Sequence, residues 1–277
     1  MYLYHADALA LGGTVVRPVP DIIESQVACS LPTAGGTASS RSGRFEYKGL
    51  ISFESAQSSL TGNVETRNGV PFNVTRVSVV IEGLNILHMV MADRIVARLA
   101  AEHGPKEPNR PSEPKILTTG CQFEGLRIAG HAATVETDHG LFAKFPTYFD
   151  WQTGWKGADN GTLRNCIMGN TLPAALDPAR PVHFQEIHRG FTEQRDAPEL
   201  KPIVLSSFVK QVTGINSPEI DCWGPIIVVP QFGTIYLGEV VVSSGQRRVN
   251  MLRLELGSPD AGTFIIGSTG GNGSGYP

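Results

Sequence analysis

The chain has 277 residues and a formal net charge of −3, from 23 basic and 26 acidic side chains. It contains no run of five basic residues, which excludes the usual electrostatic basis for binding nucleic acid. No apolar run approaches the roughly 18 residues that a membrane span needs. We therefore expect neither a nucleic acid partner nor a membrane span.

The composition favours a β-rich globular fold. Charged residues make up 18% of the chain, and 31 Gly and 19 Pro are present. Glycine and proline interrupt helices and mark turns, so many short strands are predicted. Residues 1–13 lack the basic segment of a signal peptide, which predicts a soluble cytoplasmic protein and leaves signal-independent export open.

Two segments in the first third of the chain alternate with a period of two. In residues 44–54, RFEYKGLISFE, the apolar residues fall on one face and the charged ones on the other. Residues 76–82 repeat the pattern, with Val77, Val79 and Ile81 facing inward. This alternation predicts strands of an antiparallel sheet with one buried face.

The sequence of residues 92–101 fits either a helix or a strand. Ile95, Val96 and Leu99 form a helical stripe, and Gly104 follows as a helix stop. The same residues also alternate with Arg94 and Arg98. The segment continues strand-like sequence without a break, so we predict a strand and keep the helix as the alternative.

The sequence EGLNILH at 82–88 is echoed by EGLRIAGH at 124–131. An isolated glycine inside a strand usually marks a bulge or bend, so we predict an internal strand–bend–strand repeat covering 76–99 and 115–137. The alternative is a symmetric metal or catalytic site. That site would be built from His88, His131, Glu82 and Glu124.

Residues 140–181 predict an irregular insertion rich in proline and aromatic residues. Exposed aromatic faces can stack on sugars, and nearby polar groups can fix a ligand's orientation. The alternative is an aromatic cluster that pins the insertion to the sheet. The candidate ligand-binding residues are Tyr148, Asp150, Trp151, Trp155 and Asp159.

Catalytic candidates are few and belong to no complete motif. HFQEIH at 183–188 departs from the zinc-protease pattern, because its two histidines are five residues apart and share no helical face. The remaining candidate acids and bases are Asp138, His139, Glu186 and His188. The four cysteines are scattered, so we expect buried free thiols, no metal and no cofactor.

The last part of the chain predicts a central hairpin and a flexible tail. Ile235, Leu237 and Val241 are assigned to one face of a strand, and Tyr236, Val240 and Val242 to the other. Leu252, Leu254 and Leu256 share a face of the next strand. A hairpin apolar on both sides is buried between two layers, either of one sandwich or of two subunits. Residues 268–277 have the composition of a Gly-rich linker.

The predicted fold is all-β, with antiparallel sandwich-like sheets and a long irregular insertion. An N-terminal half at 1–139 and a C-terminal half at 182–267 flank the insertion. The expected function is non-enzymatic, through self-association into a homo-oligomer or through binding. Carbohydrate binding by the loop at 141–155 is one alternative. A sugar-active hydrolase or lyase is the other.

Overall fold

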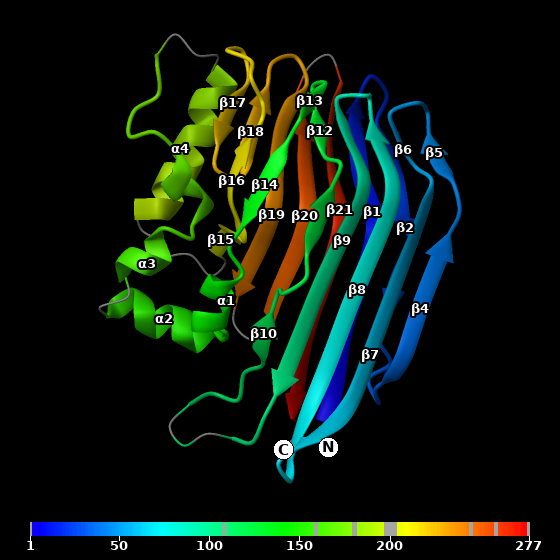
Figure 1. Cartoon of the computed structure of the whole chain (residues 1–277), viewed down its shortest axis with the longest axis vertical. Coiled ribbons are helices and arrows are strands. Elements are labelled where there is room, and N and C mark those ends of the chain that lie inside the picture. The colour runs from blue at the N-terminus through cyan, green and yellow to red at the C-terminus, as the bar shows by residue number, and fades with distance from the viewer. Residues whose placement is uncertain are drawn as a thin grey trace.

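The structure is a computed structural model, and it describes residues 2–106, 108, 110–157, 160–178, 182–196, 204–243, 246–257 and 260–275. Two antiparallel sheets face each other, and the helices lie together on one side of them (Figure 1). The predicted all-β fold is confirmed. Within the described part of the chain, no helix is long and apolar enough to cross a membrane.

Sheet A combines the two ends of the chain. Its strands run in the order β17-β18-β19-β20-β21-β1-β2, with β15 on β19 and β3 on β1. Their bounds are β1 Tyr2–Arg17, β2 Asp21–Gln26, β3 Cys29–Ser30, β15 Val204–Ser207, β17 Asp221–Trp223, β18 Ile226–Val229, β19 Gly233–Ser243, β20 Gln246–Leu256 and β21 Ala261–Gly275. The N-terminal and C-terminal halves expected from the sequence therefore share one sheet.

Sheet B is built from residues between 36 and 132. Its main path is β13-β12-β9-β8-β6-β5, with β7 on β8, β4 on β7, and β10 and β11 on β9. The bounds are β4 Gly36–Ser42, β5 Phe45–Tyr47, β6 Ile51–Phe53, β7 Ser55–Arg67, β8 Val70–Ile86, β9 Val90–His103, β10 Lys115–Leu117, β11 Gln122–Glu124, β12 Arg127–Ile128 and β13 His131–Ala132. A separate pair joins β14 Thr134–Thr137 to β16 Val209–Thr213.

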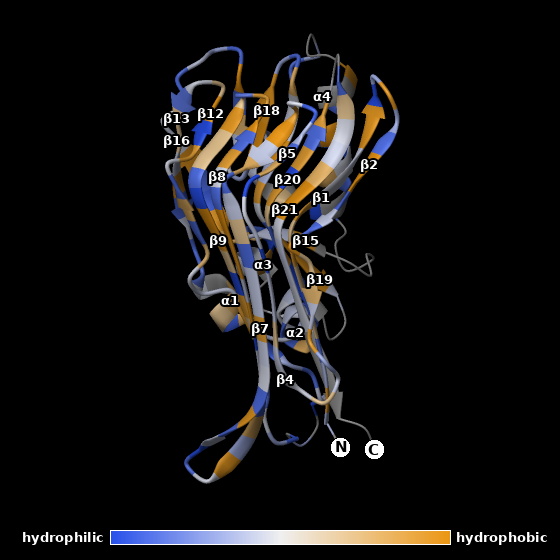
Figure 2. Ribbon diagram, turned by 90° about the vertical axis from the view of Figure 1, so that its right-hand side faces the viewer, coloured by the Kyte–Doolittle hydropathy of each residue, from blue (hydrophilic) through white to orange (hydrophobic). Residues whose placement is uncertain are grey.

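The side view shows the two sheets as layers and the β7–β8 hairpin projecting past them (Figure 2). Strand β9 pairs with β8 only from Asn73 onward, so the hairpin tip has no strand on that side. Between the layers, Val77, Val79 and Ile81 are buried as predicted. Residues 92–101 lie within β9, which confirms the strand prediction there.

The insertion is helical where the sequence predicts irregular chain. It holds α1 Gly140–Lys144, α2 Tyr148–Lys156, α3 Asn160–Arg164, the 3-10 turn η1 Met168–Thr171 and α4 Val182–Asp196. Thr147 starts α2 with a complete capping box, since its side chain and that of Asp150 each accept from the other's backbone N–H. Such local caps explain how a Pro-rich stretch still forms short helices.

Residues 44–54 form a hairpin and not one strand. Lys48 and Gly49 both have positive φ, at 47° and 68°, and they turn the chain between β5 and β6. Phe45 therefore pairs with Phe53, and their rings stack at 5.3 Å. Apolar and charged residues still alternate on both sides of the turn. The alternation pattern alone therefore could not reveal the turn.

The Gly-rich C-terminus is the centre of a sheet, which corrects the prediction of a flexible tail. Strand β21 continues to Gly275 and pairs with β1 on one side and β20 on the other. A Cβ on Gly271 would lie 3.3 Å from the Leu99 side chain in sheet B. Glycine thus lets the two sheets approach closely at this end of the sandwich.

The echo is a structural repeat on both sides of β9. Gly83 and Gly125 have nearly the same positive φ, 64° and 61°, and each follows a glutamate that pairs with Arg94. The Arg94 guanidinium lies 3.2 Å from Glu82 and 3.8 Å from Glu124.

Each copy then ends in a two-residue turn with positive φ, at Leu87–His88 and at Ala129–Gly130. His88 therefore corresponds to Gly130 and not to His131. That register removes the symmetric pairing of histidines that the alternative site requires.

All four cysteines are free. Cys121 and Cys166 are buried, Cys29 is half-buried and Cys222 is exposed, so the expectation of buried thiols is wrong for Cys222. Burial raises the pKa of the Cys121 thiol to about 11.

Candidate binding groove on sheet A

A groove of about 740 Å³ runs along the outer face of sheet A beneath α4. Its floor comes from the central strands β19, β20 and β21, and its wall comes from β15 and α4. The lining residues are Glu186, Ile187, Gly190, Phe191, Leu205, Tyr236, Glu239, Val241, Arg248, Asn250, Arg253, Glu255 and Ile265. A groove of this size fits a small molecule.

A bend at Gly238 brings Tyr236 and Glu239 onto the same face. Gly238 has a φ of 59°, and the pairing of β19 with β20 skips from Leu237 to Glu239. A Cβ at Gly238 would lie 2.7 Å from Val209 and 2.9 Å from Phe208. Only glycine meets both demands, the left-handed backbone and the close contact.

The bend also corrects the predicted faces of β19. Ile235, Leu237, Val240 and Val242 all belong to the core between the sheets, whereas Val241 lines the groove. The sequence-based assignment is right before Gly238 and reversed after it, because the left-handed backbone at Gly238 shifts the alternation by one residue. In β20, Leu252, Leu254 and Leu256 are buried on one face as predicted.

Glu239 is the centre of a buried polar network. Its side chain is 2% exposed, and its carboxylate accepts from Arg253 Nε at 2.8 Å and from Asn250 Nδ2 at 2.9 Å. Arg253 also pairs with Glu255, which accepts a hydrogen bond from the Tyr236 hydroxyl at 3.1 Å. Two glutamates therefore hold one arginine, so each charge in the network has a partner.

Aromatic rings surround the arginine. The Arg253 guanidinium lies 3.7 Å from the centroid of the Tyr236 ring, which in turn contacts Phe191 of α4 at 5.8 Å. Burial first, and then the Glu255 carboxylate, raise the pKa of the Tyr236 hydroxyl. The hydroxyl thus stays protonated and remains a donor to Glu255.

Two polar groups at the groove have no partner among the residues that the structure describes. Asn250 is 3% exposed, and its Oδ1 accepts no hydrogen bond from the described residues. Because Nδ2 donates to Glu239, a flip of the amide would place Oδ1 against a carboxylate. Glu186, on the exposed side of α4, makes no ion pair within the described part of the chain.

A search against family models matches residues 2–243 to a family described as a domain of unknown function, DUF8256. The chain belongs to this family. No curated protein matches this DUF8256 chain, and neither does any solved structure.

The aromatic residues predicted to bind a ligand are packed inside this DUF8256 protein. Trp151 and Trp155 are 4% and 8% exposed, and Trp151 Nε1 donates to the Phe145 carbonyl at 2.9 Å. Tyr148 is half-buried at the start of α2, while Asp150 caps that helix and pairs with Arg110. Asp159 lies outside the described residues.

This placement matches the alternative of an aromatic cluster that pins the insertion. The Arg247 guanidinium, 5.9 Å from the Trp151 ring, donates to the Phe145 carbonyl at 3.0 Å and so ties the insertion to β20. Burial lowers the pKa of Arg247 to about 9. Neither buried tryptophan offers the open ring face that sugar stacking needs.

The four candidate acids and bases do not converge. Asp138 accepts from the Gly140 amide at 2.9 Å, and His139 stacks on Phe208 at 4.9 Å. Burial lowers the pKa of His139. On α4, His188 Nε2 lies 2.7 Å from the Pro173 carbonyl, and only Glu186 of the four lines the sheet A groove.

No three His, Cys, Asp or Glu side chains gather as metal ligands within the described ranges. The residues that form the groove network, Tyr236, Glu239, Asn250 and Arg253, were not singled out as site residues from the sequence. The one usable signal was Gly238, an isolated glycine inside an apolar strand.

Proposed function

We propose that this protein is a non-enzymatic binding protein whose sheet A groove receives a small amine with an apolar body. The observation that supports this proposal is the buried Glu239 network at the floor of the groove. Buried charge networks give little net stability compared with packed apolar residues. A network kept on the outer face of a sheet, beside an open groove, is therefore better explained by recognition than by folding.

The charges of the groove favour a cation. Glu186, Glu239 and Glu255 face two arginines, which leaves one carboxylate in excess. Both arginines are already paired, Arg253 with Glu239 and Arg248 with Asp7 at 2.9 Å. An ammonium group near Glu186 would supply the missing charge, and its N–H groups could also donate to Asn250.

The walls favour an apolar body on the same ligand. Ile187 and Phe191 from α4 face Val241 and Ile265 from the sheet across the groove. Burying each methylene group of a ligand there contributes roughly 0.8 kcal/mol. An alkyl amine of moderate length combines both features.

Calorimetric titration with n-hexylamine, n-hexanol and hexanoate tests the proposal. At pH 7 we expect hexylammonium to bind at least tenfold more tightly than hexanol, and hexanoate not to bind. Glu186→Gln should reduce the affinity for hexylammonium about tenfold, while Glu24→Gln, on the edge strand β2, should leave it unchanged. Equal binding of all three compounds, or no binding of hexylammonium, would reject the proposed ligand class.

Self-association is a second candidate, favoured by an apolar surface at the β1–β2 hairpin. Val16, Val19 and Ile22 are 57%, 64% and 70% exposed and lie within seven residues of one another. β2 is also the last strand of sheet A in the described chain. An open edge beside apolar side chains is a template for pairing with a second copy.

Light scattering on a size-exclusion column tests this candidate. We expect a mass that rises from 29.7 kDa toward twice that value with concentration. Ile22→Lys should hold the mass at the monomer value, because a charged residue on an edge strand opposes pairing. A monomeric wild-type protein at high concentration would exclude self-association.

A further inference from the structure

The outer face of sheet B has its own groove, of about 520 Å³. Two cross-strand rows make its floor. Ser59, Ser78 and Arg98 are paired side by side on β7, β8 and β9. Thr61, Arg76 and Ala100 form the next row, and Leu117 of β10 continues it as a wall.

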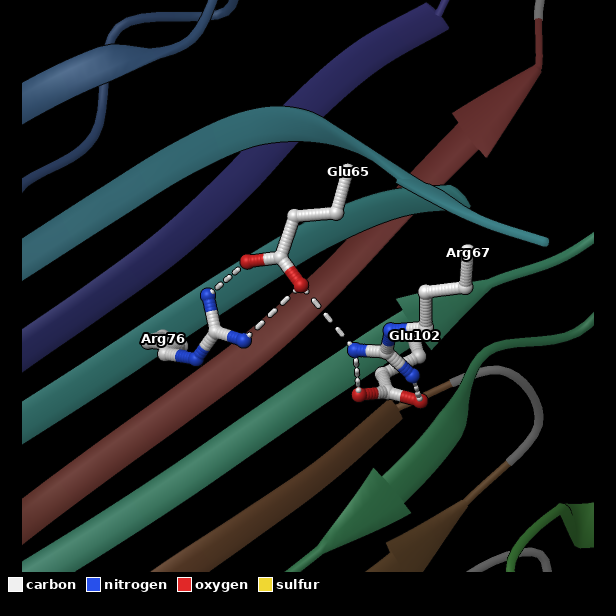
Figure 3. Close-up of polar contacts among 4 residues, drawn as sticks. All are labelled: Glu65, Arg67, Arg76 and Glu102. Carbon is white, nitrogen blue, oxygen red and sulfur yellow. Dashed lines mark hydrogen bonds and ion pairs between the residues drawn. The ribbon is translucent and has the colours of Figure 1, made fainter. Parts of the chain in front are cut away.

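Four arginines lie on this face, and three of them are paired with glutamates. Arg94 lies between Glu82 and Glu124. Arg76 pairs with both carboxylate oxygens of Glu65, and Arg67 joins that carboxylate to Glu102, as Figure 3 shows. Every carboxylate in these two groups is thus occupied by Arg94, Arg76 or Arg67.

Arg98 lies on β9 between Arg94 and the row that contains Arg76. Its side chain has no partner in the part of the chain that the structure describes. Its backbone is fixed, because Arg98 N donates to Cys121 Sγ at 3.2 Å and the thiol donates back to the Arg98 carbonyl at 3.3 Å. Gly120, with a φ of 90°, leaves room for the side chain, since a Cβ there would lie 3.1 Å from the guanidinium. The site therefore presents a free guanidinium at a defined place on a rigid sheet.

Hydroxyl groups surround this guanidinium. Ser78 is its direct neighbour across the β8–β9 pair, and Ser59, Thr61 and Thr119 line the same groove. Directly opposed Cβ atoms in an antiparallel pair are about 4.5–5.5 Å apart, so one ligand can contact Arg98 and Ser78 together. The planar guanidinium suits a two-oxygen anion, and serine and threonine hydroxyls suit the hydroxyls of a sugar.

We propose that the sheet B groove is a second binding site, which recognises an acidic sugar through Arg98 and the hydroxyl row of Ser59 and Ser78. The carboxylate of the sugar accepts from Arg98, and its hydroxyls exchange hydrogen bonds with the two serines. Leu117 supplies an apolar contact for the C–H groups of the ring. The site is independent of the sheet A groove and of the insertion that carries Trp151.

Calorimetric titration with glucuronate, glucose and sodium sulfate tests the assignment at low ionic strength. Glucuronate should bind at least tenfold more tightly than glucose or sulfate, because only glucuronate satisfies both the guanidinium and the hydroxyls. Arg98→Gln should weaken glucuronate binding at least tenfold, and Ser78→Ala about threefold. Arg44→Gln, at a side chain 77% exposed before β5, is the matched control and should change nothing.

Sulfate binding equal to that of glucuronate would assign the site to a free oxyanion and overturn the sugar assignment. Binding that Arg98→Gln leaves intact would overturn the site itself. Glu186→Gln should leave the affinity for glucuronate unchanged. The test of the sheet B groove is therefore independent of the test of the sheet A groove. An unchanged unfolding midpoint of Arg98→Gln shows that any loss of binding is local.

Discussion

The outer faces of the two sheets carry the same kind of ion pair in opposite surroundings. On sheet A, Glu239 and Arg253 are 2% and 16% exposed, and they lie on the floor of the groove whose wall includes helix α4. On sheet B, Glu65 and Arg76 are 25% and 49% exposed, and the network is open to water (Figure 3). Because desolvation dominates the energy of a buried pair and solvent screens an exposed one, the two faces should respond very differently to the same substitution.

The largest expected effect is on the buried pair. Glu239→Gln removes the charge that Arg253 Nε contacts but keeps the shape of the side chain. We expect the free energy of unfolding to fall by about 3 kcal/mol, since one partner of a buried pair is left partly uncompensated. Urea unfolding followed by circular dichroism measures the change.

The matched variant on the open face is Glu65→Gln. It removes an equivalent carboxylate from a pair exposed to water, so the expected loss is less than about 1 kcal/mol. Equal losses for the two variants would contradict the contrast between the faces.

The second largest effect is expected at the bend formed by Gly238. Gly238→Ala forces a residue with a Cβ into a left-handed conformation and against Phe208 and Val209. We expect a loss of about 2–3 kcal/mol, from backbone strain together with overpacking. Gly69→Ala, at a φ of 79° with open space around it, is the control and should cost about 1 kcal/mol. The same cost at both glycines would mean that the contacts of Gly238 with Phe208 and Val209 are unimportant.

The smallest effect is the pH and salt dependence of the open face. Hydrogen bonds from Arg76 and Arg67 lower the pKa of Glu65 from 4.5 to about 2. Folding therefore favours the charged carboxylate, so its contribution is present above about pH 4.5 and is lost as the pH falls through about 2. We expect the difference in stability between wild type and Glu65→Gln to disappear toward pH 2, and also in 1 M NaCl. A difference that persists in high salt would show that the pair is not screened.

The strands of sheet B that alternate cleanly could be predicted from sequence, and several strands of sheet A could not. Val77, Val79 and Ile81 reveal β8, because large apolar residues recur every second position. β1 and β21 pair along almost their whole length, yet they are rich in alanine and glycine. Small residues allow the sheets to approach, and the same smallness removes the hydropathy signal on which the prediction depends.

The groove on sheet A was not predicted, because it depends on one shift in alternation. Simple alternation places Tyr236 and Glu239 on opposite faces, and the bend at Gly238 brings them together. An isolated glycine within a strand correctly predicted the bends at Gly83 and Gly125. The same rule applied to Gly238 would have placed Glu239 beside Tyr236.

The aromatic insertion is the opposite case, in which the sequence suggested a binding site and the structure buries its tryptophans. Its tryptophans were candidates because aromatic residues gather in one short segment. Chain composition does not reveal which ring faces are covered, and Trp151 and Trp155 are buried.

The most direct test of the sheet A groove is a measurement of nuclear Overhauser effects between bound n-hexylamine and the labelled methyl groups of the protein. The account predicts contacts from the alkyl chain to Ile187 on α4 and to Val241 and Ile265 on the sheet, and these contacts should need about tenfold more ligand in Glu186→Gln. Contacts confined to other methyl groups, or none at ligand saturation, would contradict the proposal that this groove is the binding site.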